Sequence, residues 1–218
     1  MNGKWNLIFS SIILAAITQV VLLQPAAMLQ TSNYESYINS RLNFKLEYPS
    51  DWKIFELDAP ALSNLKGFVS FEPLKSEQEL QAGIVEETPV ISIITEQLKF
   101  KNITINEFAR LQSDNIRYLF SDFDFKLENK TAITIGNNTG VKIVYTFVDP
   151  YSHGDLKIRN GMEIWTIRAD TVYTISYLGE KDQYFKHLSA VQKIIDSFEI
   201  IDQTDRQAKS RIIPPIMI

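Results

Sequence analysis

Apolar and polar residues alternate along most of the middle of the chain, with the two-residue period of strands that bury one face. In the first of these segments, Phe44, Leu46 and Tyr48 alternate with Lys45 and Glu47. We expect strands at residues 44–48, 52–57, 67–71, 89–95, 125–135, 141–148, 158–168 and 172–178. The last four form two pairs, each joined by a short turn-forming segment, Gly136–Gly140 or Ala169–Thr171. The pattern therefore predicts hairpins in a mostly antiparallel sheet.

Two segments show helical spacing instead. The first starts after Thr104, which forms a capping-box pattern with Glu107. Its apolar face is formed by Ile105, Phe108, Ala109, Ile116, Leu119 and Phe120. The second covers residues 181–196, with an apolar stripe of Tyr184, Leu188, Val191 and Ile195. Antiparallel strands with two amphipathic helices predict an α+β fold, an α/β/α sandwich whose helices cover a central antiparallel sheet.

An uncharged apolar segment from Trp5 to Leu23 precedes this domain. It predicts an N-terminal apolar helix of nearly the 20 residues that span a bilayer, whereas a signal-peptide core is usually shorter. Lys4 lies before the segment and no further charge follows until Glu35, so both interpretations place the domain outside the cytoplasm. We expect a signal peptide or transmembrane anchor at 1–28, a polar spacer at 29–40, one folded domain at 41–201 and a flexible tail at 202–218.

Composition and charge narrow the function classes. The chain of 218 residues is 45% hydrophobic, which is enough for one packed domain. Its net charge is −4, with acids and bases interleaved and no basic block, which argues against nucleic-acid binding. The absence of cysteine excludes disulfides, thiolate metal sites, a cysteine nucleophile and lipid attachment through a cysteine.

Four sequence features together carry a family resemblance. They are Phe44, Tyr48, Pro49 and Trp52 in a pattern F-x-x-x-Y-P-x-x-W, the strand Gly67–Phe71, the aromatic residues Trp165, Tyr173 and Tyr177, and the ending Ile194–Phe198. Over residues 41–201 the chain resembles the PsbP/Mog1 superfamily, a PsbP-like exported domain. The resemblance implies an α/β/α sandwich around an antiparallel sheet.

The members of this superfamily have different roles. PsbP proteins are extrinsic subunits that support the manganese–calcium centre of photosystem II, Mog1 binds a small GTPase in the nucleus, and bacterial relatives are exported. The present chain lacks the lipid-attachment cysteine of the cyanobacterial proteins, and its predicted export separates it from Mog1. What the resemblance implies is a non-enzymatic domain that binds or steadies a partner.

One loop carries candidate metal ligands. Asp149, His153 and Asp155 could place two carboxylates and an imidazole around a divalent ion. Their spacing matches no EF-hand or zinc motif, and the Asp, Pro, Ser and Gly content of the loop is typical of a solvated turn. We interpret it as a turn and expect no cofactor, with a weak calcium or manganese site as the alternative.

Catalytic and modification motifs are sparse. A serine nucleophile would need His153 or His187, and no Gly-x-Ser-x-Gly elbow is present to position that serine. Three Asn-x-Thr sequons begin at Asn102, Asn129 and Asn137, at expected loops or element ends where glycan could be accommodated.

These observations together predict a non-enzymatic binding or assembly module, either anchored to the membrane or secreted after signal cleavage. Its expected partner is another membrane or extracytoplasmic protein, with membrane contact through residues 5–23. Two alternatives stay open: a carrier of a small apolar ligand or lipid between the helix layer and the sheet, and a hydrolase.

Overall fold

The computed structural model describes residues 33–58, 64–75, 81, 88–99, 102–149 and 156–201. The expected leader and the expected tail both lie outside these ranges. Within the described ranges, no helix is long and apolar enough to cross a membrane.

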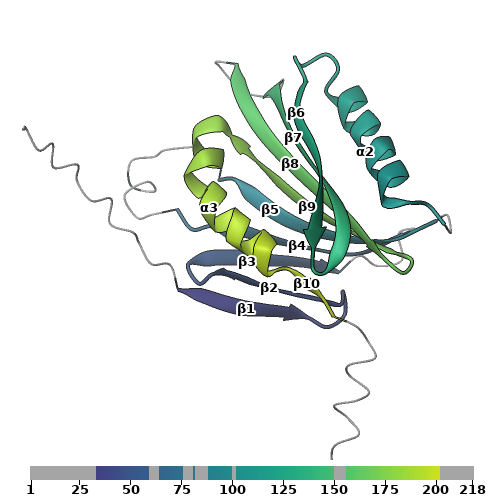
Figure 1. Cartoon of the computed structure of the whole chain (residues 1–218). Coiled ribbons are helices and arrows are strands. Elements are labelled where there is room, and N and C mark those ends of the chain that lie inside the picture. Colours follow the sequence, from purple (N-terminus) through teal and green to yellow (C-terminus); the bar gives the residue numbers. More distant parts are fainter. Residues whose placement is uncertain are drawn as a thin grey trace, which may run out of the picture. The chain divides into compact units, whose positions relative to one another are not determined.

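The described elements form two antiparallel sheets and two long helices (Figure 1). In chain order they are β1 (Tyr34–Asn39), β2 (Phe44–Pro49), β3 (Trp52–Asp58), β4 (Leu65–Pro73), β5 (Val90–Gln97), α2 (Ile105–Leu119), β6 (Lys126–Ile135), β7 (Asn138–Asp149), β8 (Lys157–Arg168), β9 (Thr171–Glu180), α3 (Lys181–Ser197) and β10 (Glu199–Ile200). The large sheet has the order β3-β4-β5-β9-β8-β7-β6, and the small sheet the order β1-β2-β10. The predicted α+β sandwich is confirmed.

The two faces of the large sheet bury separate hydrophobic cores. On one face, α3 and the small sheet pack over the sheet, with Phe44, Phe71 and Val191 fully buried among them. On the other face, Phe108 and Ala109 of α2 pack against side chains of β7, β8 and β9. The helices α2 and α3 therefore cover opposite faces (Figure 1), because alternate residues of each strand point in opposite directions.

The segment expected to be a polar spacer contains β1, which pairs with β2 in register from Tyr34 opposite Pro49 to Asn39 opposite Phe44. Tyr37 explains why this polar sequence forms a strand. Its ring makes an edge contact with Phe71 at 5.4 Å between centroids, so one face of β1 belongs to the core.

The turns are tighter than the sequence pattern predicts. Between β6 and β7 the turn consists of Gly136 and Asn137 alone, both with positive φ, as a two-residue hairpin requires. At the other end of the domain, α3 begins at Lys181 directly after β9 ends at Glu180. This junction without a loop fixes where α3 starts on the sheet.

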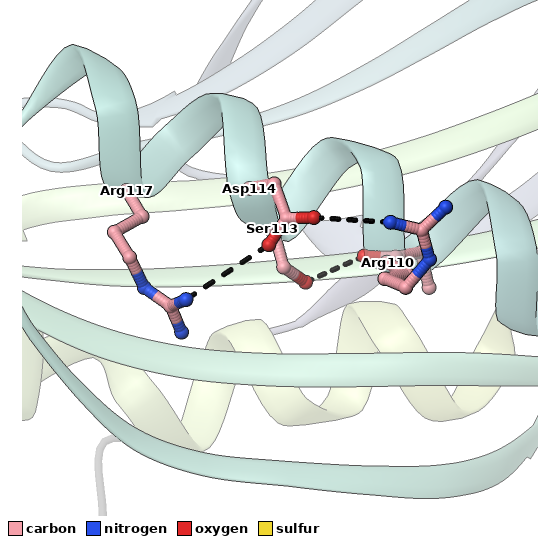
Figure 2. Close-up of polar contacts among 5 residues, drawn as sticks. Arg110, Ser113, Asp114 and Arg117 are labelled. Atoms are coloured by element: carbon pink, nitrogen blue, oxygen red, sulfur yellow. Dashed lines mark hydrogen bonds and ion pairs between the residues drawn. The ribbon is translucent and has the colours of Figure 1, made fainter.

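The helix α2 is stabilised along its exposed side. Thr104 Oγ1 accepts a hydrogen bond from the Glu107 amide, and the Glu107 carboxylate accepts one from the Thr104 amide, so the predicted capping box is present. Figure 2 shows the Asp114 carboxylate between two guanidinium groups, 3.3 Å from Arg110 and 3.9 Å from Arg117. These charges pair within the helix itself.

Candidate functional site

An open groove of about 810 Å³ lies between α3 and strands β7 and β8. Its floor is formed by Lys142 and Val144 of β7 and by Asn160 and Met162 of β8, and its wall by the flank of α3 between Tyr184 and Asp196. We call it the α3 groove.

Strand register explains which side chains form the floor. Val144 lies opposite Met162, and Lys142 lies opposite Ile164, so these residues share the face that α3 covers. Asn160 and Met162 are two residues apart, which places both on this face, while Gly161 between them points to the other. The floor residues therefore follow from the two-residue period of β7 and β8.

The two ends of the groove carry different polar side chains. Because α3 follows β9 without a loop, and β8 is antiparallel to β9, α3 runs back along the direction of β8. Asn160 lies opposite Gly179, beside the start of α3, and Lys142 lies level with Ile164, four residues further along β8. The groove thus runs from a neutral amide to a charged end.

The middle of the groove is apolar. Met162 is buried and Val144 and Leu188 are partly buried against the same core, whereas Phe185 is 54% exposed at the mouth. The neighbouring Tyr184 is fixed below them, since its backbone carbonyl accepts a 2.8 Å hydrogen bond from the Tyr177 hydroxyl. Burial raises the pKa of Tyr184 to about 12, so its phenol is neutral at physiological pH.

Asn160 is the unusual residue of the groove. Its side chain is only 7% exposed, and its Oδ1 is buried without a hydrogen-bond partner among the described residues. Thr95 Oγ1 is in the same condition, but Thr95 does not line the groove. This oxygen is fully buried and lies beneath the groove surface, where an unpaired acceptor costs about 1–3 kcal/mol of stability.

The charged end carries two lysines, Lys142 and Lys193, and one carboxylate, Asp196, and neither lysine forms an ion pair within the described residues. Lys193 stacks its ammonium 3.6 Å above the Tyr34 ring, and Asp196 Oδ1 accepts a 2.8 Å hydrogen bond from Gln192. This end of the groove therefore favours an anionic group.

The candidate metal ligands are only partly placed. Asp149 is buried at the end of β7, where its Oδ2 lies 2.6 Å from Nε of Arg159 in an ion pair. His153 and Asp155 lie outside the described residues, and the described part contains no cluster of three metal-ligating side chains. The Asp149 carboxylate is already bound to a guanidinium, which a metal ion would have to displace. The calcium or manganese site stays a prediction.

The other candidates lie apart from the groove. The His187 ring makes an edge contact with Trp52 at 5.8 Å between centroids, which assigns it a packing position. The sequon residues Asn102, Asn129 and Asn137 are all exposed, and Asn129 lies within the edge strand β6 rather than in a loop. Their glycosylation stays a prediction.

Sequence reasoning missed Asn160 and Lys142. A signal for Asn160 was available. It lies two residues from Met162 and four from Ile164, on the same face of β8, where an apolar side chain is expected. Lys142 gave no comparable signal. Its place beside α3 depends on the pairing of β7 with β8, which only the folded arrangement reveals.

Comparisons with known proteins agree with this architecture. A family model described as PsbP-like protein matches residues 25–200. No curated protein matches the chain. Cyanobacterial PsbP (CyanoP) from Synechocystis sp. PCC 6803 is 12% identical with a TM-score of 0.54, covering 78% of this chain and 93% of that one.

Two further solved structures share the fold. LpqN, involved in cell envelope biogenesis of Mycobacterium tuberculosis, is 12% identical with a TM-score of 0.51, covering 79% of this chain and 88% of that one. The Saccharomyces cerevisiae Ran-binding protein Mog1p is 10% identical with a TM-score of 0.51, covering 79% and 98%. At these identities the structures show the fold alone, whereas the family model covers most of the sequence. The chain belongs to the PsbP-like protein family.

Proposed function

We propose that this chain is a non-catalytic module that binds and helps to assemble a partner protein on the outer side of the cell membrane. Its family and its neighbours support a binding role, since one neighbour is named as a Ran-binding protein and another as part of cell envelope biogenesis. The apolar segment 5–23 after Lys4 supports export, and it would tether the domain if it is retained.

The α3 groove is the observation that carries this proposal. It combines an apolar middle with a charged end formed by Lys142, Lys193 and Asp196. No histidine is among the lining residues that the structure describes, and the one carboxylate among them, Asp196, already accepts a hydrogen bond from Gln192. General base catalysis needs a base oriented toward a nucleophile. The groove is therefore equipped for binding rather than for hydrolysis.

A carrier of a small apolar ligand or lipid is the second candidate, and the size of the groove favours it. About 810 Å³ falls within the range of roughly 300–1,000 Å³ that small-molecule sites occupy. Such sites bury most of their ligand, however, and the exposed Phe185 shows that this groove is open along its mouth. A segment that enters from a partner protein fits an open groove better.

Site-specific photo-cross-linking in native membranes tests the proposal. A photoreactive phenylalanine analogue replaces Phe185 at the groove, and in a matched control it replaces Tyr118, which is 81% exposed on α2 at the opposite face. We expect one defined protein adduct from position 185 and none from position 118. Protease added to cells stripped of their outer barriers should digest the domain. Protection of the domain, or equal adducts from both positions, would contradict the proposal.

A further inference from the structure

We propose that the edge strand β3 pairs with β3 of a second copy of this chain, so that the large sheets of two copies join into one continuous sheet. The inference goes beyond the proposed function and does not involve the α3 groove. Three properties of β3 support it: its open backbone edge, its exposed apolar side chains and the match of the strand to itself.

The outer edge of β3 carries backbone groups that can bind another strand. β3 and β6 are the two edge strands of the large sheet (Figure 1), and β3 pairs only with β4. In an antiparallel pair, every second residue directs its N–H and C=O away from the partner strand. Among the described residues, no backbone group bonds to this outer edge of β3. The edge therefore offers donors and acceptors at the spacing that an extended strand matches.

The side chains of β3 are apolar on both faces and exposed on both. Ile54 is 37% exposed and shares a face with Trp52, which belongs to the core on the α3 side. Phe55 is 57% exposed and Leu57 is 50% exposed, and both lie on the other face. An edge strand that combines apolar side chains with free backbone groups favours pairing with another strand.

The other edge of the large sheet is protected, whereas β3 is not. β6 carries Lys126, Glu128 and Lys130, and its pairing with β7 has a register shift between Leu127 and Asn129. Charged side chains and bulges are devices by which proteins prevent edge-to-edge pairing. β3, by contrast, pairs with β4 without a register shift along its whole length. The difference between the edges makes β3 the one suited to pairing.

The charges of β3 do little to protect its edge. Lys53 lies opposite Glu72 of β4, where the two charges attract each other. The Glu56 carboxylate accepts a hydrogen bond from the Tyr37 hydroxyl of β1. The third charged residue, Asp58, ends the strand. Two of the three charges are therefore complemented within their own domain.

The strand matches itself in one antiparallel register. Centred on Phe55, the pairing places Phe55 opposite Phe55 of the second copy, and Lys53 opposite Leu57. On the other face, Ile54 lies opposite Glu56. Centring the pairing on Lys53 or Glu56 would bring two like charges together, and centring it on Ile54 would leave the end of the strand unpaired. A second copy therefore fits β3 along its full length.

The absence of cysteine makes a disulfide test specific. Phe55→Cys, Lys53→Cys and Lys130→Cys are each introduced into the full chain in native membranes and oxidised under identical conditions. Directly opposite residues of an antiparallel pair have Cα atoms about 4.5 or 5.5 Å apart, which a disulfide can bridge. In the proposed register, the two copies of position 53 are four strand residues apart, at least about 13 Å, which is too far.

We expect a disulfide-linked dimer from Phe55→Cys. We expect none from Lys53→Cys, on the same face of the same strand, and none from Lys130→Cys on the exposed opposite edge. Lys53→Cys and Leu57→Cys, carried by two differently tagged copies, should cross-link with each other, because the register places these positions opposite one another. Random collisions between exposed cysteines would not produce this pattern.

Association without a covalent bond is measured by analytical ultracentrifugation of the full chain in detergent. Phe55→Lys places two like charges opposite each other at the centre of the pairing, so it should weaken the dimer at least about tenfold. Tyr118→Lys, at the 81% exposed site on α2, is the matched control and should stay within about twofold of wild type. Urea unfolding should show that both variants are folded, since both sites are exposed.

The inference fails if Phe55→Cys gives no dimer, or if Lys53→Cys and Lys130→Cys give as much dimer as Phe55→Cys does. It also fails if the wild type is monomeric, or if Phe55→Lys associates as strongly as Tyr118→Lys. A photoreactive group at position 55 that captures a different protein, and no second copy, would make β3 an edge for a partner's strand instead. A defined adduct from position 185 would leave the proposed function standing in each of these cases.

Discussion

Glu163 of β8 lies directly opposite Ser176 of β9, and the Ser176 hydroxyl donates a 2.7 Å hydrogen bond to the Glu163 carboxylate. Burial raises the pKa of Glu163 from 4.5 to about 7, and hydrogen bonds from Ser176 and Tyr145 offset only part of this shift. The pair lies on the sheet face opposite the α3 groove, because Met162 beside Glu163 points toward α3. This carboxyl is therefore a titrating group separate from the binding site.

The raised pKa predicts a pH-dependent stability. Between about pH 4.5 and 7, the folded state binds more protons at Glu163 than the unfolded state does, so stability falls as pH rises through this window and levels off above it. Glu163→Gln should remove this pH dependence of stability. Above pH 7 the variant should be more stable than wild type by about 1–3 kcal/mol. Urea unfolding at several pH values measures both effects, with Glu128→Gln on the exposed strand β6 as control. Parallel pH profiles for wild type and Glu163→Gln would contradict the assignment.

The two buried tryptophans should dominate the core energetics. Trp52 is 7% exposed and Trp165 is 2% exposed, and they belong to the cores on opposite faces of the large sheet. Trp→Ala at either position should destabilise the domain by about 3–5 kcal/mol. Tyr118→Ala, at a highly exposed site, should cost less than about 0.5 kcal/mol. A loss below about 1 kcal/mol at either tryptophan would show that the core on that face is not packed as described.

Much of the fold was predictable because its signals are local. Thr104 and Glu107 specified the start of α2 through a cap that three residues of separation define. Trp165 lies within the strand expected at residues 158–168, and the structure places it in β8. The strand β1 could not be predicted in this way, since its burial depends on Tyr37 meeting Phe71, which lies far away in sequence. When the burial of a short strand depends on a residue far away in sequence, the strand's own residues carry little pattern from which it can be predicted.

The candidate site was less predictable than the fold. In the sequence, clusters such as Asp149, His153 and Asp155 are the conspicuous candidates, because their polar residues are close neighbours along the chain. The α3 groove instead combines Lys142, Asn160 and Leu188 from three elements, each ordinary in its own segment. Only the register of β7 with β8, and the direct passage from β9 into α3, bring them together.

The buried ion pair between Asp149 and Arg159 should be sensitive to the loss of one partner. Both side chains are largely shielded from water, so Arg159→Met removes a buried ion contact of Asp149 and should cost about 3–5 kcal/mol. The exposed pair of Lys45 and Glu199 is the matched control, and Lys45→Met should cost less than about 1 kcal/mol. Thermal or urea unfolding measures both. Equal, small losses of stability in the two variants would show that the buried pair of Asp149 and Arg159 stabilises the fold no more than the exposed pair does.

The same pair bears on metal binding. We expect no micromolar binding of calcium, manganese or zinc at Asp149, because the Arg159 guanidinium already holds this carboxylate. Calorimetric titration of wild type and His153→Ala with each ion decides the matter. Micromolar manganese or zinc binding that is lost in His153→Ala, and that weakens as pH falls through the histidine titration, would instead establish a metal site in this loop.

The helix α2 offers a comparison between a cap and a surface ion pair. Thr104→Ala removes a side-chain acceptor at the helix start and should cost about 1 kcal/mol. Asp114→Ala removes the exposed pairing with Arg110 and Arg117 in Figure 2 and should cost no more than about 0.5 kcal/mol. Unfolding measurements at low and high salt separate the two, since only the second loss should shrink with salt. The reverse ranking would contradict this account of α2.

The direct junction between Glu180 and Lys181 limits how this family member can change over evolutionary time. One residue inserted there would turn every following side chain of α3 by about 100° around the helix axis. Leu188 would then leave the groove, and Val191 would leave the core. A lineage that acquires a new ligand can therefore exchange side chains along the groove but cannot lengthen this connection. The spacing between helix and sheet is inherited, and the side chains that line it are free to diversify.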